Sequence, residues 1–243
     1  MSSPAFNEKI FNKVQATDYA DAGAMTVSGT INKTGILFLL MLSTAIVSWN
    51  LEGQGLGGIL MISGLVVGLI VSLVIIFKRE TAPTLAPVYA LAEGLVLGSI
   101  SAMYEVAKPG IAMNAMVSTF SCLALMLGLY HFRILQATPR FQKVMAVAMG
   151  AIVMTYICNM IAGFMGHPMA FINQGGTFGI LFSVVVVGVA ALNFIIDFTV
   201  IEQGAASRAP KYMEWYCAFG VLLTLVWLYL EILRLLSKLN NRR

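Results

Sequence analysis

The chain has 243 residues, of which 59% are hydrophobic and only 11% carry a charged side chain. A soluble domain carries charges on about 25% of its residues, because its surface must face water. The segments 53–77, 109–132 and 144–196 contain no Asp, Glu, Lys or Arg. This composition excludes a soluble globular domain, a disordered chain, a nucleic-acid-binding domain and a disulfide-stapled secreted domain. It indicates a protein that crosses a membrane several times.

Seven stretches are apolar over enough residues to cross a bilayer, whose hydrocarbon core of about 30 Å requires about 20 residues of helix. Turn-forming or charged residues separate each stretch from the next. The apolar runs do not alternate with polar residues, so we expect a helical bundle and not a transmembrane barrel. The fold class is therefore an all-α integral membrane protein with seven transmembrane helices. The expected spans are 34–51, 56–77, 85–106, 111–131, 144–165, 177–200 and 213–236.

The segment 1–33 is polar and carries charges of both signs. It lacks the basic start and apolar core of a secretory signal, so we interpret it as a cytoplasmic tail. An amphipathic turn at 6–14, lying on the membrane, is one option within it. The transmembrane domain then covers 34–236, and 237–243 form a short basic C-terminal tail.

The distribution of Lys and Arg predicts the orientation in the membrane. Ten of these 15 residues lie in the N-terminal tail or in the loops after the second, fourth and sixth spans. That side is expected to be cytoplasmic, with the N-terminus inside. Four basic residues near the C-terminus would lie outside if the last helix crosses, and inside if it is re-entrant. We favour seven crossings, because 214–236 is long enough to span the membrane.

Small residues recur every fourth position in the third expected span, and two glycines have the same spacing in the second. On a helix, this spacing forms a smooth stripe that lets another backbone approach closely. We interpret both stripes as helix-packing surfaces. Their members are Ala90, Gly94, Gly98 and Ala102, together with Gly64 and Gly68.

No motif predicts a metal site, a phosphate-binding loop or a catalytic centre. The three cysteines, Cys122, Cys158 and Cys217, all fall inside expected spans, and the two histidines have no metal-ligand spacing. An intramembrane hydrolase would require a Gly-x-Gly-Asp motif or a Ser/His pair, and neither is found. We therefore expect no enzyme activity and no cofactor, with Ca²⁺ as a candidate transported or transiently bound ion.

Four carboxylates lie within or at the ends of expected spans: Glu93, Asp197, Glu214 and Glu231. An ionised acid at mid-membrane costs about 2.5–3.5 kcal/mol on insertion scales, so such residues usually face the bundle interior. With a rise of 1.5 Å per residue, Glu93 and Asp197 lie about 12 Å and about 5 Å from the cytoplasmic ends of their helices. Glu214 lies at the start of its helix, and Glu231 lies eighteen residues, or about 27 Å, from the expected helix start at 213.

These depths place Glu93, Asp197 and Glu214 in the inner half of the membrane. Lys78, Arg79 and His131 are expected nearby, whereas Glu231 belongs at the outer end beside Arg234. Carboxylates that share a low-dielectric site cannot all be ionised, so a proton or a cation can occupy the site. The alternative is that these acids form purely structural pairs with Lys78, Arg79 and Lys211. Both interpretations remain open.

Four segments of the sequence together resemble a known family, the Bax inhibitor-1 family, in its bacterial YccA-like branch. Two are Ala92-Glu-Gly-Leu-Val-Leu-Gly-Ser-Ile-Ser in the third span and Ala191-Leu-Asn-Phe-Ile-Ile-Asp-Phe in the sixth. The others, in the seventh span, are Glu214-Trp-Tyr-Cys-Ala-Phe-Gly and Val226-Trp-Leu-Tyr-Leu-Glu-Ile-Leu-Arg-Leu-Leu. The resemblance implies a bundle with a central C-terminal helix, in a bacterial cytoplasmic (inner) membrane.

The resemblance also implies a pH-sensitive calcium leak. In the family, one acid on the sixth helix and one on the seventh act with a basic residue at the cytoplasmic end of the second helix. Asp197 matches the sixth-helix acid, and Lys78 or Arg79 matches the basic residue.

The seventh-helix acid can be matched in two ways. The Leu-Tyr-Leu-acid string places it at Glu231, whereas the end of the helix places it at Thr224, which is not an acid. In the second case, Glu93 or Glu214 would take over the role of the missing partner.

Two functions follow as hypotheses. The first is a cation leak gated by protonation of buried carboxylates, in a protein whose partner is the lipid bilayer. The second is a non-conducting regulator of a membrane protein such as a protease, acting through its N-terminal tail and helix faces.

Overall fold

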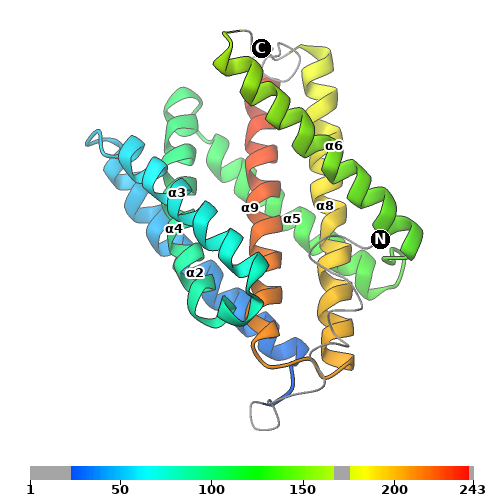
Figure 1. Ribbon diagram of the computed structural model, residues 1–243. Coiled ribbons are helices and arrows are strands. Elements are labelled where there is room, and N and C mark those ends of the chain that lie inside the picture. Colours follow the sequence, from blue (N-terminus) through cyan, green and yellow to red (C-terminus); the bar gives the residue numbers. More distant parts are fainter. Residues whose placement is uncertain (1–22, 167–175, 241–243) are drawn as a thin grey trace. The chain divides into compact units, whose positions relative to one another are not determined.

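The computed structural model describes residues 23–166 and 176–240 (Figure 1). Within these residues, seven helices are long and apolar enough to cross a membrane. The expected all-α, seven-helix membrane fold is confirmed. The amphipathic turn considered at 6–14 lies outside the described residues. The helices are α2 (Val27–Glu52), α3 (Gly57–Phe77), α4 (Ala82–Ala107), α5 (Ile111–His131), α6 (Pro139–Phe164), α8 (Thr177–Ala206) and α9 (Met213–Asn240), with a short 3₁₀ turn, η1 (Arg79–Thr81).

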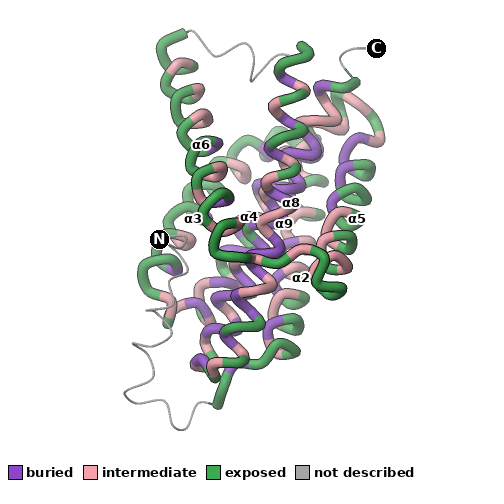
Figure 2. Tube along the Cα trace, turned by 90° about the vertical axis from the view of Figure 1, so that its right-hand side faces the viewer, coloured by how far each residue is buried: buried purple, intermediate pink, exposed green. Residues whose placement is uncertain are grey.

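The chain divides into two compact units. The first, the α2–α4 unit, contains α2, α3, η1 and α4 with the end of α8 from Asp197 and the start of α9 up to Leu223. The second, the α5–α6 unit, contains α5 and α6 with the preceding part of α8 and the following part of α9. Most of α6 is exposed, whereas much of α4 and α9 is buried (Figure 2).

Several helices extend beyond the apolar stretch that predicts them. The first begins at Val27 and not at 34, because the Thr26 side chain caps it by accepting a hydrogen bond of 3.0 Å from the Gly29 amide. Lys33, which was expected in the polar tail, is thus a helical residue. Likewise α6 begins at Pro139, where Thr138 provides the cap.

The last helix is continuous from Met213 to Asn240, a length of about 42 Å at 1.5 Å per residue. This length is sufficient to cross a bilayer and favours the crossing arrangement over the re-entrant one. The helix also includes residues that were expected in the basic C-terminal tail. Lys238 is one of them, and it is buried.

Helix α4 packs against both α2 and α3 (Figure 1). A β-carbon at Gly98 would lie 2.9 Å from the Cα of Ala45 on α2, and one at Gly64 would lie 2.6 Å from the carbonyl oxygen of Ala92 on α4. Only glycine allows backbones to approach this closely. Gly94 likewise faces the α2 backbone at Met41.

Hydroxyl groups cross the same contact between α2 and α4. Ser48 Oγ donates to the carbonyl oxygen of Leu95 at 2.8 Å, and Thr44 Oγ1 donates to that of Leu91 at 2.9 Å. Ser48 Oγ also lies 2.6 Å from Ser99 Oγ, which donates to the carbonyl oxygen of Gly57 on α3. These bonds satisfy buried polar groups and join α2, α3 and α4 where their backbones are close.

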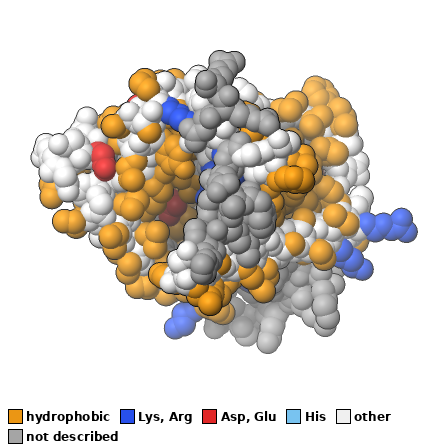
Figure 3. Space-filling model, turned by 90° about the horizontal axis from the view of Figure 1, so that it is seen from above, with side chains coloured by type: hydrophobic (Ala, Val, Ile, Leu, Met, Phe, Trp, Pro, Cys, Tyr) orange, Lys and Arg blue, Asp and Glu red, His pale blue; other side chains and the backbone are white. Residues whose placement is uncertain are grey.

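Hydrophobic side chains also cover much of the molecular surface. Large exposed apolar residues occur along α3 and α6, for example Ile59, Leu69 and Val147. Seen from above, coloured hydrophobic side chains outnumber charged ones (Figure 3), and the exposed residues of α3 and α6 extend this apolar surface along the helices. A surface of this kind suits contact with lipid chains.

The close contact at Gly98 is testable with Gly98→Ala. The added methyl group meets the backbone of Ala45, which cannot move aside as a side chain can. We expect the free energy of unfolding to fall by about 1–3 kcal/mol, as is typical of overpacking. Thermal unfolding of the detergent-purified protein measures this change. Gly150→Ala, where a β-carbon meets nothing within 4 Å, is the control and should be neutral or stabilising.

Candidate functional site

The candidate carboxylates occupy separate environments. Glu93 and Glu214 have their contacts within the α2–α4 unit, and Asp197 belongs to that unit as well. Glu231 belongs to the α5–α6 unit. The sequence of the ranges 110–196 and 224–243 contains no other Asp or Glu. Each acid must therefore be considered with its own partners.

Glu214, near the start of α9, is completely buried and surrounded by donors. Its Oε1 accepts hydrogen bonds from the backbone amide and the hydroxyl of Thr26, at 2.9 Å and 3.0 Å, and lies 3.3 Å from Lys211 Nζ. Its Oε2 forms an ion pair with Lys33 of α2. Both oxygens are thus engaged, as expected for a buried carboxylate that remains ionised.

Thr26 and Lys33 were not recognised as partners of Glu214 from the sequence. Both precede the apolar stretch of the first span, where polar residues are typical of a tail. Thr26, Gly29 and Lys33 are three and four residues apart, so they lie on one face of α2. This spacing is the signal that, together with the cap of Thr26, would have indicated a contact surface.

Asp197, on α8, is buried with 6% of its surface exposed. Cys217 of α9 lies within electrostatic range of both Asp197 and Arg79. The Arg79 guanidinium donates a hydrogen bond to the hydroxyl of Tyr216, and its Cζ lies 5.3 Å from the ring centroid. Cys217 of α9 thus lies near Asp197 of α8, and Arg79 of η1 contacts Tyr216, the residue before Cys217.

The two basic candidates after α3 differ in their environment. Lys78 is exposed at the C-terminus of α3, whereas Arg79 is half-buried and directed at Tyr216. Arg79 is therefore the better candidate for the basic partner of Asp197. The sequence left these two adjacent residues equivalent, and the turn η1 distinguishes them.

Glu93, in the middle of α4, is half-buried. It accepts a hydrogen bond from the hydroxyl of Tyr89, one turn earlier. A β-carbon at Gly68 of α3 would lie 3.3 Å from Glu93 Oε2, so the absence of a side chain there leaves room for the carboxylate. The Tyr89 ring packs edge-on against Phe219 of α9, with 4.8 Å between centroids. Glu93 is thus connected to α9 through Tyr89.

Glu231 is buried in a network that joins α9 to α6. The Tyr156 hydroxyl donates to Glu231 Oε1 at 2.8 Å, and Arg234 Nη1 donates to the Tyr156 hydroxyl at 2.7 Å. Arg234 Nη1 also lies 3.0 Å from Glu231 Oε1. The sequence spacing indicates the Arg234 pair, but Tyr156 lies far away in the sequence and could not be found from it.

Two further polar contacts occur within the α5–α6 unit. Lys238 Nζ donates to the carbonyl oxygen of Gly179 at 3.1 Å and to Ser183 Oγ at 2.8 Å. Asn193 Nδ2 donates to Thr224 Oγ1 at 3.0 Å. Thr224 is the position that the second of the two matches assigns to the seventh-helix acid. There, a neutral pair joins α8 to α9.

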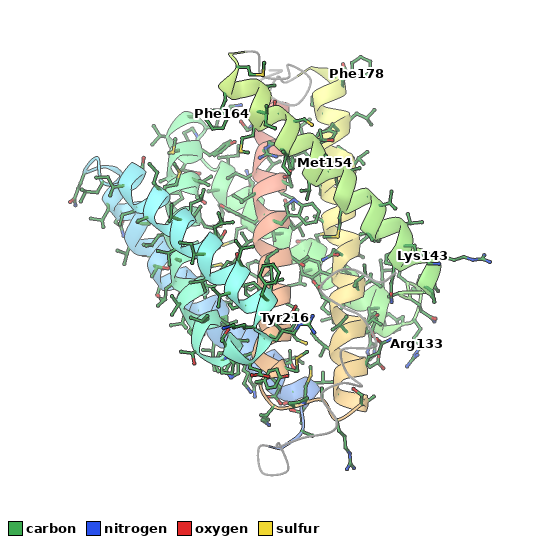
Figure 4. All side chains as sticks on the ribbon, viewed as in Figure 1. Arg133, Lys143, Met154, Phe164, Phe178 and Tyr216 are labelled. Carbon is green, nitrogen blue, oxygen red and sulfur yellow. The ribbon has the colours of Figure 1, made fainter. Side chains whose placement is uncertain are left out.

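His131 ends α5, where it is exposed and its ring packs against Phe132, with 5.4 Å between centroids. Arg133, in the connection from α5 to α6, and Lys143, near the start of α6, extend outward (Figure 4). Among residues 23–166 and 176–240, no three His, Cys, Asp or Glu side chains are grouped so that they could hold a metal ion.

The chain matches the protein family described as Bax inhibitor 1 like over residues 3–241. Because the match covers nearly the whole chain, the protein belongs to this family. Comparison with curated proteins and with solved structures found no match.

The network around Glu231 is testable with Tyr156→Phe. The substitution removes the hydroxyl that lies between Arg234 and Glu231 and leaves a buried carboxylate with fewer donors. We expect a loss of about 1–3 kcal/mol in the free energy of unfolding, measured by thermal unfolding in detergent. Tyr104→Phe, at a half-buried tyrosine of α4, is the control. Equal stability of the two variants would contradict a stabilising role for this network.

Proposed function

We propose that this Bax inhibitor 1 like protein is a pH-sensitive cation leak, with Ca²⁺ as the candidate ion and Asp197 as the group that senses the proton. The observation that carries the proposal is the environment of Asp197: a buried carboxylate within a membrane-spanning helix, close to Cys217 and in the neighbourhood of Arg79. Neither a catalytic role nor a cofactor is part of the proposal.

The physical basis is the cost of burying a charge. An ionised carboxylate in an apolar bundle requires a compensating positive charge, and Arg79 supplies it in the closed state. Protonation of Asp197 removes the negative charge and therefore the attraction that holds Arg79. The leak is expected to increase as the pH falls, because the neutral acid no longer attracts η1 toward α8.

The other acids have different roles in the proposal. Glu93 is the second candidate for proton sensing, because its hydrogen bond from Tyr89 is a neutral one. Glu214 and Glu231 are each held by a basic residue, Lys33 and Arg234 respectively. Both carboxylates are thus already engaged in ion pairs, so the proposal gives them a structural role.

We further propose that the end of the α2–α4 unit containing Thr26, Arg79 and Lys211 faces the cytoplasm of a bacterial inner membrane. The contacts of Thr26 with Glu214 and of Arg79 with Tyr216 support a common side for the start of α2, the η1 turn and the α8–α9 connection. Arg208 and Lys211 of that connection add to its positive charge. The excess of positive charge on one side is typical of a cytoplasmic face.

Asp197→Asn tests the proposed function directly. The amide is nearly the same size but cannot take up a proton, so we expect the calcium leak to lose its dependence on pH. The measurement is calcium entry into dye-loaded proteoliposomes between about pH 6 and pH 8. Glu202→Gln, at an exposed acid farther along α8, is the matched control and should keep the wild-type pH profile.

An unchanged pH profile in Asp197→Asn would remove Asp197 from the mechanism. No leak from folded wild-type protein at any pH would contradict the proposal as a whole and favour the non-conducting regulator. A protein lacking residues 1–22 but retaining α2 would then show whether the tail binds a membrane partner such as a protease.

A further inference from the structure

We propose that Glu214 completes the N-terminal cap of α2 from a distant helix, and that this contact positions the first turn of α9 for the Asp197 site. The effect on the leak rests on the proposed function, whereas the contact itself does not. The residues involved are named here the α2–α9 clasp: Thr26, Gly29, Lys33 and Glu214.

In an ordinary capping box, the N-cap Ser or Thr bonds the amide of the third helical residue, and a Glu or Gln at that third position accepts from the N-cap amide. In α2 the first half is present, because Thr26 Oγ1 accepts from the Gly29 amide at 3.0 Å. The third position is Gly29, which has no side chain to accept the Thr26 amide. Glu214 Oε1 accepts it instead, at 2.9 Å.

Gly29 is what allows the distant carboxylate to replace the missing side chain. A β-carbon at this position would overlap the carboxylate of Glu214. At Gly35, farther along the same helix, a β-carbon meets nothing within 4 Å. The requirement for glycine therefore belongs to the contact with Glu214 and not to α2 in general.

Lys33 fixes the same carboxylate from the next turn of α2. It pairs with Glu214 Oε2, and its ammonium lies 5.5 Å from the ring centroid of Trp215. Lys33 therefore contacts two consecutive residues of α9. The backbone reinforces the contact, because the Met25 amide donates to the carbonyl oxygen of Ala209 at 2.7 Å.

The clasp acts on the Asp197 site through the register of α9. Successive residues of a helix are about 100° apart, so fixing Glu214 against α2 also fixes the directions of Tyr216 and Cys217. These two residues face the groups of the proposed gate, since Tyr216 bonds Arg79 and Cys217 lies near Asp197. Lys33 and Glu214 are accordingly positioning residues that act through α9.

The test compares Gly29→Ala with Gly35→Ala. Both changes replace a glycine of α2 by a better helix former, but only the first displaces the Glu214 carboxylate. We expect Gly29→Ala to lower the melting temperature and to raise the calcium leak of proteoliposomes at about pH 8, where the gate is closed, by about fivefold or more. Gly35→Ala should keep or raise the melting temperature and leave the calcium leak at the wild-type rate.

A double-mutant cycle with Lys33→Met and Glu214→Gln measures the ion pair separately. Gln keeps an acceptor for the Thr26 amide but removes the charge, so the effect of Lys33→Met on stability should be much smaller in the Glu214→Gln background. Lys33→Met and Glu214→Gln should each shift the pH at which the leak is half-maximal. Lys33→Arg, which keeps the positive charge, should leave that pH at the wild-type value. Independent effects on stability would show that the pair does not couple α2 to α9 and would overturn the proposal.

The possible failures are distinguishable. If Gly29→Ala behaves like Gly35→Ala in both unfolding and flux, the clasp is absent and the inference is overturned. If Gly29→Ala lowers stability but the leak and its pH profile stay at wild-type values, the contact is purely structural and its positioning role is overturned. If the wild type does not leak at all, the proposed function and the positioning role both fail, whereas the melting temperatures of Gly29→Ala and Gly35→Ala still decide whether Glu214 caps α2.

Discussion

The cost of a charge in an apolar environment governs how this bundle is assembled. Removing an ion from water costs several kcal/mol, so each buried charge must meet an opposite charge or several hydrogen bonds. Glu214 meets Lys33 and the amide of Thr26, and Glu231 meets Arg234 and Tyr156. Both partnerships join α9 to another helix, α2 in one unit and α6 in the other. The charges of α9 therefore specify its neighbours, while its apolar residues provide the packing.

Glycine has the complementary role of bringing backbones near enough for these contacts. Gly94 and Gly98 let α4 approach α2 so closely that Ser48 and Thr44 reach carbonyl groups of α4. Gly29 leaves room for the Glu214 carboxylate, and Gly68 leaves room for that of Glu93. At these four positions, the missing side chain of glycine provides the space that a helix or a carboxylate occupies. The buried charge pairs and the close contacts at glycines together explain why a bundle with few charges still has a defined arrangement within each unit.

The sequence predicts the spans well, because an apolar stretch of about 20 residues has few alternatives to a membrane helix. It predicts the helix ends poorly. Hydropathy detects where the apolar stretch ends. A helix continues past that point to the residue that caps its backbone groups, and its end can include charged residues that pair with a neighbouring helix. Lys33 and Lys238 illustrate this difference: both resemble tail residues in the sequence, and both lie within helices and bond to a neighbouring helix. Tyr156, a partner from another helix, is beyond the reach of local spacing.

The contrast among the acids gives the strongest argument for Asp197 as the proton-sensing group. Glu214 and Glu231 are each fixed by a basic residue and by further donors, which gives them structural roles. Arg79, in contrast, lies over the face of Tyr216 and bonds its hydroxyl, an interaction that does not require a negative charge. In the proposed gate, Arg79 therefore retains a favourable contact with α9 when Asp197 takes up a proton. Opening such a gate requires less free energy than opening one in which loss of the ion pair leaves a buried cation without any partner.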